Sequence, residues 1–397
     1  PPGSPSIARW LLSTIAIGLI VGVSVFAIFY FGVFNHQNGP VSTGTPTSTP
    51  VANGSPVTGG NGSILHVQGN RLLDSAGNAV ILRGAQIESA FNVQHLTSSE
   101  QAATANLKLS TFQVMHTDWH MNVLRLPICN YLWEKDQSGY VSRLQGVVSQ
   151  ANQAGLYVIM DLHADSRCGL PAKTSAKMPL QDVIPFWQAI ASTFKNAPMV
   201  IFDAYNEPNN PNDDYSFWLH GGSINGTTYV GMQQIVDTIR QQGAKQPIVV
   251  ESLTNEHGLS TIGNNLVNDP NIIYSWHNYF KQNGERTPAD WDRLFGDFSQ
   301  SHAVLVGEWA FLPNANYPTF CQGVSQSEAI QLVQNFLSYM QDHNVSWTAW
   351  NFEPSHLIVN YSSYIPTTLN TSWTCGQKTT SVGMGELLKQ YLSQSPT

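Results

Sequence analysis

Apolar runs rich in β-branched residues alternate with helical stretches along most of the chain, and this alternation restricts the fold more than any other feature. In the helical stretches apolar residues recur three and four positions apart, as at Val183, Trp187 and Ile190. Such alternation is typical of repeated strand–helix units around a parallel sheet. The predicted strands are residues 79–85, 121–128, 156–163, 199–206, 247–251, 272–277, 303–308 and 346–350.

Eight strand–helix units predict one (β/α)8 barrel, a TIM barrel of the α/β class, over residues 63–397. The alternative is an open, doubly wound sheet, which would carry a glycine-rich turn after its first strand. The sequence at that point is Arg83-Gly84-Ala85-Gln86, which is not such a turn. We therefore expect the closed barrel.

The N-terminal part of the chain has a different composition. Residues 10–34 form a 25-residue stretch without charge, and a helix that rises about 1.5 Å per residue would cross a hydrocarbon core with that length. Arg9 precedes this stretch, which favours a cytoplasmic stub at 1–9, a transmembrane anchor at 10–34 and an extracellular remainder. The alternative is secretion after signal cleavage, but no small-residue cleavage site is evident between Phe31 and Gly44.

Residues 35–62 are predicted to be a flexible, disordered linker. Gly, Pro, Ser, Thr and Asn make up 21 of the 25 residues from Asn38 to Gly62, and none of the 25 is charged. Such a segment cannot bury a core. It would hold the barrel at a distance from the membrane.

Charge excludes one class of function. The chain has 26 acidic and 18 basic residues, a net charge of −8, whereas nucleic-acid binding needs a basic face. A metal-dependent barrel hydrolase would carry a His-x-His pair after its first strand, and the sequence has none there. We expect a monomer that needs no metal or other cofactor and binds no nucleic acid.

Polar and titratable residues lie at the carboxyl ends of the predicted strands, where barrel enzymes place their active sites. Glu207 lies at the end of the fourth strand and Glu308 at the end of the seventh, on opposite sides of the barrel. The residues expected beside them are Arg125, His163, Asn206, His277, Tyr279 and Trp350. A structural core would not gather so many polar groups, because each unpaired buried group is costly.

Two facing carboxyl groups fit the hydrolysis of a glycosidic bond, in which one donates a proton and the other attacks the carbon. At about 5–5.5 Å apart they would act with retention of configuration. Arg125 and Tyr279 are suited to keep Glu308 ionised, and His277 with a less polar wall would keep Glu207 protonated. These residues alone leave open which glutamate is the acid.

The motifs resemble glycoside hydrolase family 5, the cellulase-type retaining β-glycosidases. Asn206-Glu207-Pro208 after an apolar strand is the most specific motif. His277-Asn278-Tyr279, Gly307-Glu308 and Trp350 follow it in the matching order. The resemblance covers residues 64–397 and implies that Glu207 is the acid/base and Glu308 the nucleophile.

The resemblance also implies roles for the other residues at the strand ends. Asn206 would bind the sugar 2-hydroxyl, His277 would support Glu207, and Tyr279 and Arg125 would support Glu308. His163 would lie at the substrate and Trp350 under the sugar. Departures from the family pattern are Asp203, where glutamate is frequent, and Trp309 after Glu308.

Some aromatic and acidic residues have two interpretations. Trp133 and Trp309 are candidate sugar platforms, although packing in the core is an equal alternative. Glu88 and Glu251 also lie near strand ends, and we interpret them as structural ion-pair or rim residues.

The four cysteines follow neighbouring pairs of strands, which predicts two disulfides. Cys129 would pair with Cys168, and Cys321 with Cys375. Both bridges would close loops at the strand ends in an oxidising compartment. The alternative is four free buried thiols.

Together these features predict a membrane-tethered, outward-facing retaining endo-β-glycanase that hydrolyses β-linked polysaccharide, with β-1,4-glucan the favoured substrate. Within the family, a β-mannanase or an exo-β-glucosidase is the alternative. From another class, the alternative is a catalytically inactive carbohydrate-binding barrel.

Overall fold

The structure, a computed structural model, describes residues 62–165, 167–169, 176–254, 258–281, 284–313, 315, 318–377 and 381–394. The predicted stub, the anchor and all but the last residue of the predicted linker lie outside these ranges. Within them, no helix combines the length and the apolar character needed to cross a membrane.

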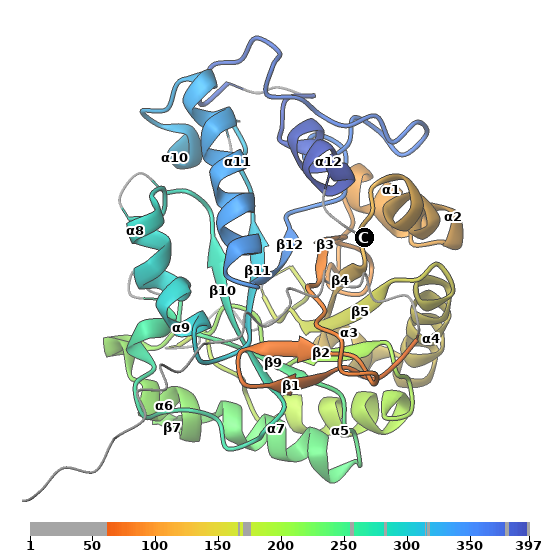
Figure 1. The fold of residues 1–397 in the computed structure, drawn as a ribbon. Coiled ribbons are helices and arrows are strands. Elements are labelled where there is room, and N and C mark those ends of the chain that lie inside the picture. The colour runs from red at the N-terminus through yellow and green to blue at the C-terminus, as the bar shows by residue number, and fades with distance from the viewer. Residues whose placement is uncertain are drawn as a thin grey trace, which may run out of the picture. The chain divides into compact units, whose positions relative to one another are not determined.

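A closed barrel of eight parallel strands forms the centre of the described chain (Figure 1). In order around the barrel, the strands are β10 (Ile272–Asn278), β11 (Val304–Trp309), β12 (Ser346–Ala349), β3 (Arg83–Gln86), β4 (Val123–Ile128), β5 (Tyr157–Leu162), β6 (Val200–Asp203) and β9 (Ile248–Glu251). Pairing of β12 with β3 joins the last strand to the first. The eight predicted strands and the barrel are confirmed.

Helices surround the barrel and cover its outer face (Figure 1). They are α1 (Ser98–Ala105), α2 (Leu109–Gln113), α3 (Asn130–Lys135), α4 (Gln137–Gln153), α5 (Val183–Phe194), α6 (Tyr215–His220), α7 (Met232–Gln241), α8 (Pro288–Trp291), α9 (Asp297–Ser299), α10 (Pro318–Cys321), α11 (Gln326–Asp342) and α12 (Gly385–Gln394). Short helical turns are η1 (Val114–Asp118), η2 (Pro211–Asp213), η3 (Leu259–Thr261) and η4 (Asp292–Gly296). Helix α5 buries Trp187 and Ile190, as its spacing predicts.

Two short hairpins were not expected from the sequence. They are β1 (His66–Gln68) with β2 (Arg71–Leu73), and β7 (Gly221–Ile224) with β8 (Thr227–Val230). Each strand has only three or four residues, and β1 and β7 contain no fully buried side chain. Runs this short and exposed carry too little apolar alternation to be recognised.

Side chains of the barrel strands divide the core in two, because successive residues of a strand point to opposite faces. Outward-facing residues such as Leu124 and Val250 pack with the helices. Inward-facing residues form a separate apolar cluster, which the hairpin β1–β2 extends through Leu72. That inner cluster contains Val123, Tyr157, Ile159, Ile201, Val249, Ile273 and Leu305.

Candidate active site

The inward face of the barrel changes from apolar to charged toward the carboxyl ends of the strands, which we call the mouth. Arg125 lies two residues beyond Val123 on β4, and both side chains point inward. The same step leads from Ile159 to Asp161, from Ile201 to Asp203, and from Val249 to Glu251. The alternation of inward- and outward-facing residues along the strands therefore fills the inner core and also places charged side chains at the mouth.

Arg125 lies at the centre of this charged group and is fully buried. Its guanidinium contacts Glu308 at 2.6 Å, and Asp161 and Asp203 each at 3.2 Å. It also donates to the side-chain oxygen of Asn206 at 3.0 Å. Burial works to lower the pKa of Arg125, but the surrounding carboxylates outweigh it and raise the pKa above its ordinary value. Arg125 is a permanent cation in contact with Glu308.

Glu308 is buried, and both of its carboxylate oxygens accept hydrogen bonds. Arg125 donates to Oε1 at 2.6 Å, and the hydroxyl of Tyr279 donates to Oε2 at 2.5 Å. Burial, followed by the charge of Glu308, raises the pKa of Tyr279 well above its ordinary value, so Tyr279 remains a hydrogen-bond donor. Both neighbours expected for Glu308 are in place.

A register shift between β10 and β11 sets the direction of Glu308. The pairing passes from Trp276 opposite Val306 to His277 opposite Glu308, so Gly307 is an extra residue in β11. A Cβ atom at Gly307 would lie 2.6 Å from the Ser275 hydroxyl and 3.0 Å from Nε2 of His277. Glycine is required at this position because the imidazole occupies the space.

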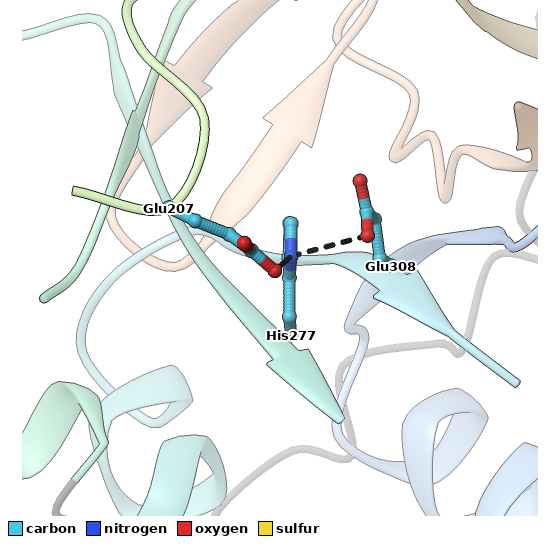
Figure 2. Close-up of side chains that lie close together, drawn as sticks. All are labelled: Glu207, His277 and Glu308. Carbon is cyan, nitrogen blue, oxygen red and sulfur yellow. Dashed lines mark hydrogen bonds and ion pairs between the residues drawn. The ribbon is translucent and has the colours of Figure 1, made fainter. Parts of the chain in front are cut away.

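The imidazole of His277 lies between the two glutamates (Figure 2). Its Nδ1 is 3.2 Å from Oε1 of Glu207 and 3.4 Å from Oε2 of Glu308, and its Nε2 is 3.3 Å from Glu251. Burial works to lower the pKa of His277, but Glu251 and Glu308 outweigh it and raise the pKa to about 9. An imidazolium therefore links the carboxyl groups at neutral pH.

Glu207 follows β6 in a left-handed backbone conformation, with φ of 48°, which is unusual for a residue other than glycine. Such conformations cluster at functional sites. Its side chain is 30% exposed and accepts hydrogen bonds from His277 and, at 3.0 Å, from Lys177. Its backbone N–H donates to Glu251 at 2.9 Å.

The protonation expected for Glu207 is wrong for the free protein. Burial works to raise the pKa of Glu207, but the hydrogen bond from His277 and the charge of Lys177 outweigh it and hold the pKa well below its ordinary value. The prediction included His277 as a partner that would favour the acid. In the structure His277 is itself cationic and favours the carboxylate.

Glu251 forms an ion pair, as expected, but its partner is His277, so Glu251 is part of the site. It is buried, and it contacts the backbone of Glu207 and the ring of His277. Burial raises the pKa of Glu251 to about 8. The pair of His277 and Glu251 thus binds more protons at neutral pH than the same side chains would in water.

His163 and Asn206 lie beside the charged group. His163 contacts Asp161 through Nδ1 at 2.8 Å, and its Nε2 is 3.4 Å from the side-chain amide of Asn206. The partly exposed ring of Trp350 lies 6.5 Å from the ring of His163. Glu88 is buried two residues beyond β3, and it forms the expected ion pair, with Arg167 at 2.5 Å.

Trp309 and Trp133 are both buried, which does not support the expectation that they bind substrate. Trp309 packs edge-on against Trp347, and Trp133 against Phe186. A sugar stacks on an exposed ring face, and these rings expose none. The alternative interpretation, packing in the core, describes both residues.

Both predicted disulfides are present. Cys129 is bonded to Cys168, and Cys321 to Cys375. The first bridge joins the segments that follow β4 and β5, and the second joins α10 to the segment that follows β12. Both therefore tie together loops at the mouth.

One ligand-type atom from each of Glu207, His277 and Glu308 lies within 4.8 Å of the others, a spacing that would also suit a cation. However, both nitrogens of His277 face carboxyl groups and carry protons at neutral pH. A protonated imidazole has no lone pair for a metal. The chemistry of the cluster fits two carboxyl groups linked by protons better than a metal centre.

A cavity of about 140 Å³ opens beside Glu207. It is lined by Glu207, Glu251, Thr254, Trp276, His277, Tyr279 and Lys281. Glu308 is not part of this lining. The cavity therefore lies on the Glu207 side of the carboxyl pair.

A (β/α)8 barrel with two close glutamates at its mouth, one buried against a fixed cation and one open to a cavity, is the arrangement that glycoside hydrolases use. The sequence matches the model of the Cellulase (glycosyl hydrolase family 5) family over residues 74–356. The chain belongs to this family.

Several curated relatives are named endoglucanases. The chain is 24% identical to Endoglucanase N of Pectobacterium atrosepticum over 297 residues, which cover 72% of this chain and 56% of that protein. It is also 24% identical to Endoglucanase 5 of Pectobacterium carotovorum, over 72% of this chain and 50% of that protein. The chain therefore spans about half the length of these relatives.

Solved structures share the fold. The β-glucanase SdGluc5_26A of Saccharophagus degradans matches with a TM-score of 0.64 and 19% identity, over 87% of this chain and 98% of that one. The catalytic domain of Thermobifida fusca endoglucanase Cel5A matches with a TM-score of 0.59 and 20% identity, over 86% and 100%. Both proteins are also known in complex with cellotetraose.

Proposed function

We propose that the protein is a retaining endo-β-1,4-glucanase. The observation that carries this proposal is the spacing of the two carboxyl groups, with an oxygen of Glu207 and an oxygen of Glu308 within 4.8 Å of each other. Retaining enzymes hold their carboxyl groups about 5–5.5 Å apart, whereas inverting enzymes leave room for a water molecule. The spacing supports direct attack by one of the two.

The surroundings of the two glutamates support different roles. Glu308 is buried, and its hydrogen-bond donors, Arg125 and Tyr279, do not lose their protons at ordinary pH. These donors keep the carboxyl group of Glu308 ionised, which is the state that a nucleophile needs. Glu207 is partly exposed, lies at a cavity and touches His277, a group that exchanges protons. An acid/base residue needs access to water and to a proton source.

The reaction then proceeds in two displacements. Glu308 attacks the anomeric carbon while Glu207 gives a proton to the glycosidic oxygen, and the leaving chain departs with a new hydroxyl group. Glu207, now ionised, removes a proton from a water molecule, whose oxygen attacks the same carbon and releases Glu308. The two inversions give net retention.

A proton donor for Glu207 lies within hydrogen-bond distance of its carboxyl group. His277 carries a proton on Nδ1, 3.2 Å from Oε1 of Glu207, because its pKa is raised to about 9. Transfer of this proton would leave a neutral imidazole and a neutral carboxylic acid. Asn206 would hold the sugar 2-hydroxyl, and His163 and Trp350 would line the sugar that is being cleaved.

A β-glucan is the proposed substrate, since curated relatives are named endoglucanases and related structures contain cellotetraose. The test is to assay carboxymethylcellulose, cellotetraose, mannan and aryl glycosides side by side, and to follow the first product by proton NMR. Hydrolysis of the glucans with the β-anomer formed first supports the proposal. First formation of the α-anomer, or preference for mannan, would reject the mechanism or the substrate, and activity on none would favour an inactive carbohydrate-binding barrel.

We also propose that residues 10–34 anchor the protein in the membrane with the barrel outside, and that it acts as a monomer. The uncharged apolar stretch after Arg9 supports the anchor. Resistance of the membrane-bound protein to carbonate extraction, with the barrel open to external protease, tests it. Release into the medium would instead indicate signal cleavage, and light scattering of the detergent-solubilised protein tests the monomer.

A further inference from the structure

Lys177 is a charged partner of Glu207 that lies outside the strand ends. Its ammonium nitrogen is 3.0 Å from Oε2 of Glu207, whereas His277 contacts the other oxygen, Oε1. Lys177 comes from the segment between β5 and α5. Neither the acid/base step nor the nucleophilic step described above involves it.

The backbone around Lys177 is tied to neighbouring segments. Its carbonyl accepts the N–H of Asn209 at 2.7 Å, and the carbonyl of Pro179 accepts the N–H of Val230 at 2.8 Å. Asn209 lies two residues beyond Glu207, so this bridge fixes the backbone of Lys177 beside the backbone of Glu207. The fold therefore places the backbone of Lys177 beside Glu207, while the ion pair itself is formed by the two side chains.

Both carboxylate oxygens of Glu207 accept hydrogen bonds from cations in the free site. Glu207 can donate a proton to a glycosidic oxygen only after one of these donors withdraws. His277 is buried on β10, but the side chain of Lys177 is 32% exposed, and a lysine carries its charge on a flexible four-carbon stem. Lys177 is the donor that is free to move.

Other titratable groups face Glu207 from each neighbouring element. They are His277 on β10, Tyr279 and Lys281 directly after β10, Glu251 at the end of β9, and Glu308 on β11. Tyr279 is uncharged, and Glu251 is protonated below pH 8 or so because burial raises its pKa to about 8. Among the residues that the structure describes, Lys177 and His277 are the two cations in direct contact with the carboxylate.

We propose that Lys177 is a positioning residue that holds Glu207 ionised in the free site and releases it to act as an acid when the leaving sugar takes over the hydrogen bonds of the ammonium group. The inference rests on the acid/base role proposed for Glu207. It predicts that full acid catalysis requires a leaving group with sugar hydroxyls. It also adds Lys177 to the residues that determine specificity on the leaving side.

The test compares the pH dependence of kcat/KM for cellotetraose in the wild type, Lys177→Met, Lys177→Arg and Lys389→Met. Lys389 is a matched control, because it pairs with Asp118 at 2.7 Å with 29% of its side chain exposed, and Asp118 precedes β4 at the opposite end of the barrel from the mouth. We expect the alkaline limb of Lys177→Met to move to higher pH by about one pH unit, since a cation that favours the ionised form is lost. Lys177→Arg and Lys389→Met should keep the wild-type limb.

A dinitrophenyl cellobioside provides the second substrate, because its leaving group needs no proton. On this substrate the profiles of the wild type and Lys177→Met should coincide. An unchanged alkaline limb for Lys177→Met on cellotetraose, with activity reduced equally at every pH, would show a purely structural role and overturn the inference.

Carbon-13 NMR titration of the Glu207 carboxyl, assigned with Glu207→Gln, gives a readout that does not depend on activity. The midpoint should be higher in Lys177→Met than in the wild type, and an equal midpoint overturns the inference. If the wild type does not hydrolyse cellotetraose, the proposed function fails, while the titration still decides the role of Lys177.

Discussion

Arg125 on β4 and Glu308 on β11 form a buried ion pair across the two strands that separate them, with 2.6 Å between Nη1 and Oε1. The guanidinium also holds Asp161 and Asp203, so one cation is shared by three buried carboxyl groups. This arrangement orients the proposed nucleophile and makes the mouth sensitive to any change at Arg125.

Arg125→Lys should lower kcat by about 100- to 1,000-fold, because an ammonium group keeps the charge but cannot bind several oxygens in the same fixed geometry. Steady-state kinetics on cellotetraose measure this loss. Arg143→Lys is the control, since Arg143 forms an exposed ion pair with Asp136. A kcat for Arg125→Lys within threefold of the wild type would contradict the role of the guanidinium.

Tyr279→Phe should lower kcat by at least about 10-fold, because Glu308 loses the hydrogen bond at Oε2. Tyr274→Phe is a control on β10, the strand that precedes Tyr279, since the hydroxyl of Tyr274 accepts the N–H of Val267 and has no contact with Glu308. We expect Tyr274→Phe to lower the thermal midpoint without changing kcat. Equal kcat values for the two variants would argue against the Tyr279 contact.

Glu251→Gln should lower the pKa of His277 below about 9, because Glu251 is the largest of the charges that raise it. A raised pKa in the folded state contributes stability that is fully present below pH 6.5 or so, the ordinary value, and that is lost as the pH rises through about 9. The variant should lose this stability at lower pH than the wild type. NMR titration of the ring Cε1–H and thermal unfolding from pH 6 to 10 measure both effects, and an unchanged His277 midpoint would reject the coupling.

Removing either disulfide should reduce the free energy of unfolding by about 2–4 kcal/mol, measured by urea denaturation. The double variant Cys321→Ala/Cys375→Ala should also lower kcat. Phe320 precedes Cys321 and stacks on Tyr279, with 5.0 Å between the ring centres. Loss of stability without loss of kcat in this variant would show that the bridge does not position Tyr279.

The barrel and the pair of glutamates could be predicted because they depend on local patterns. Each strand is a largely apolar run, and the site residues lie at or just beyond the carboxyl ends of the strands, so strand order alone brings Glu207 and Glu308 to one mouth. The disulfides followed from the same order, since each pair of cysteines lies on loops that are neighbours at the mouth.

Contacts between segments without a motif could not be predicted. Lys177 contacts Glu207, which is 30 positions away in the sequence, and Glu251 contacts the backbone of Glu207, which is 44 positions away. The expectation of a protonated Glu207 rested on His277 and a less polar wall, and it did not include the contact with Lys177 or the positive charge of His277, which both favour the carboxylate. Composition gives no signal for either contact.

Trp309 shows how one extra residue changes an interpretation. The shift at Gly307 turns Glu308 toward the mouth, so the next side chain points outward into the aromatic core beside Trp347. The sequence alone does not reveal such a shift. Trp309 was therefore among the candidate sugar platforms, although it is buried in the structure.

The most direct test of the central claim is to trap the covalent intermediate. The full-length protein is incubated with a 2-deoxy-2-fluoro-cellobiosyl fluoride, which slows the second displacement, and the labelled peptide is identified by mass spectrometry. We predict one fluorocellobiosyl group attached to Glu308. Attachment to Glu207 or another residue, or turnover of glucan with no trapped intermediate and an α-anomeric first product, would contradict the account.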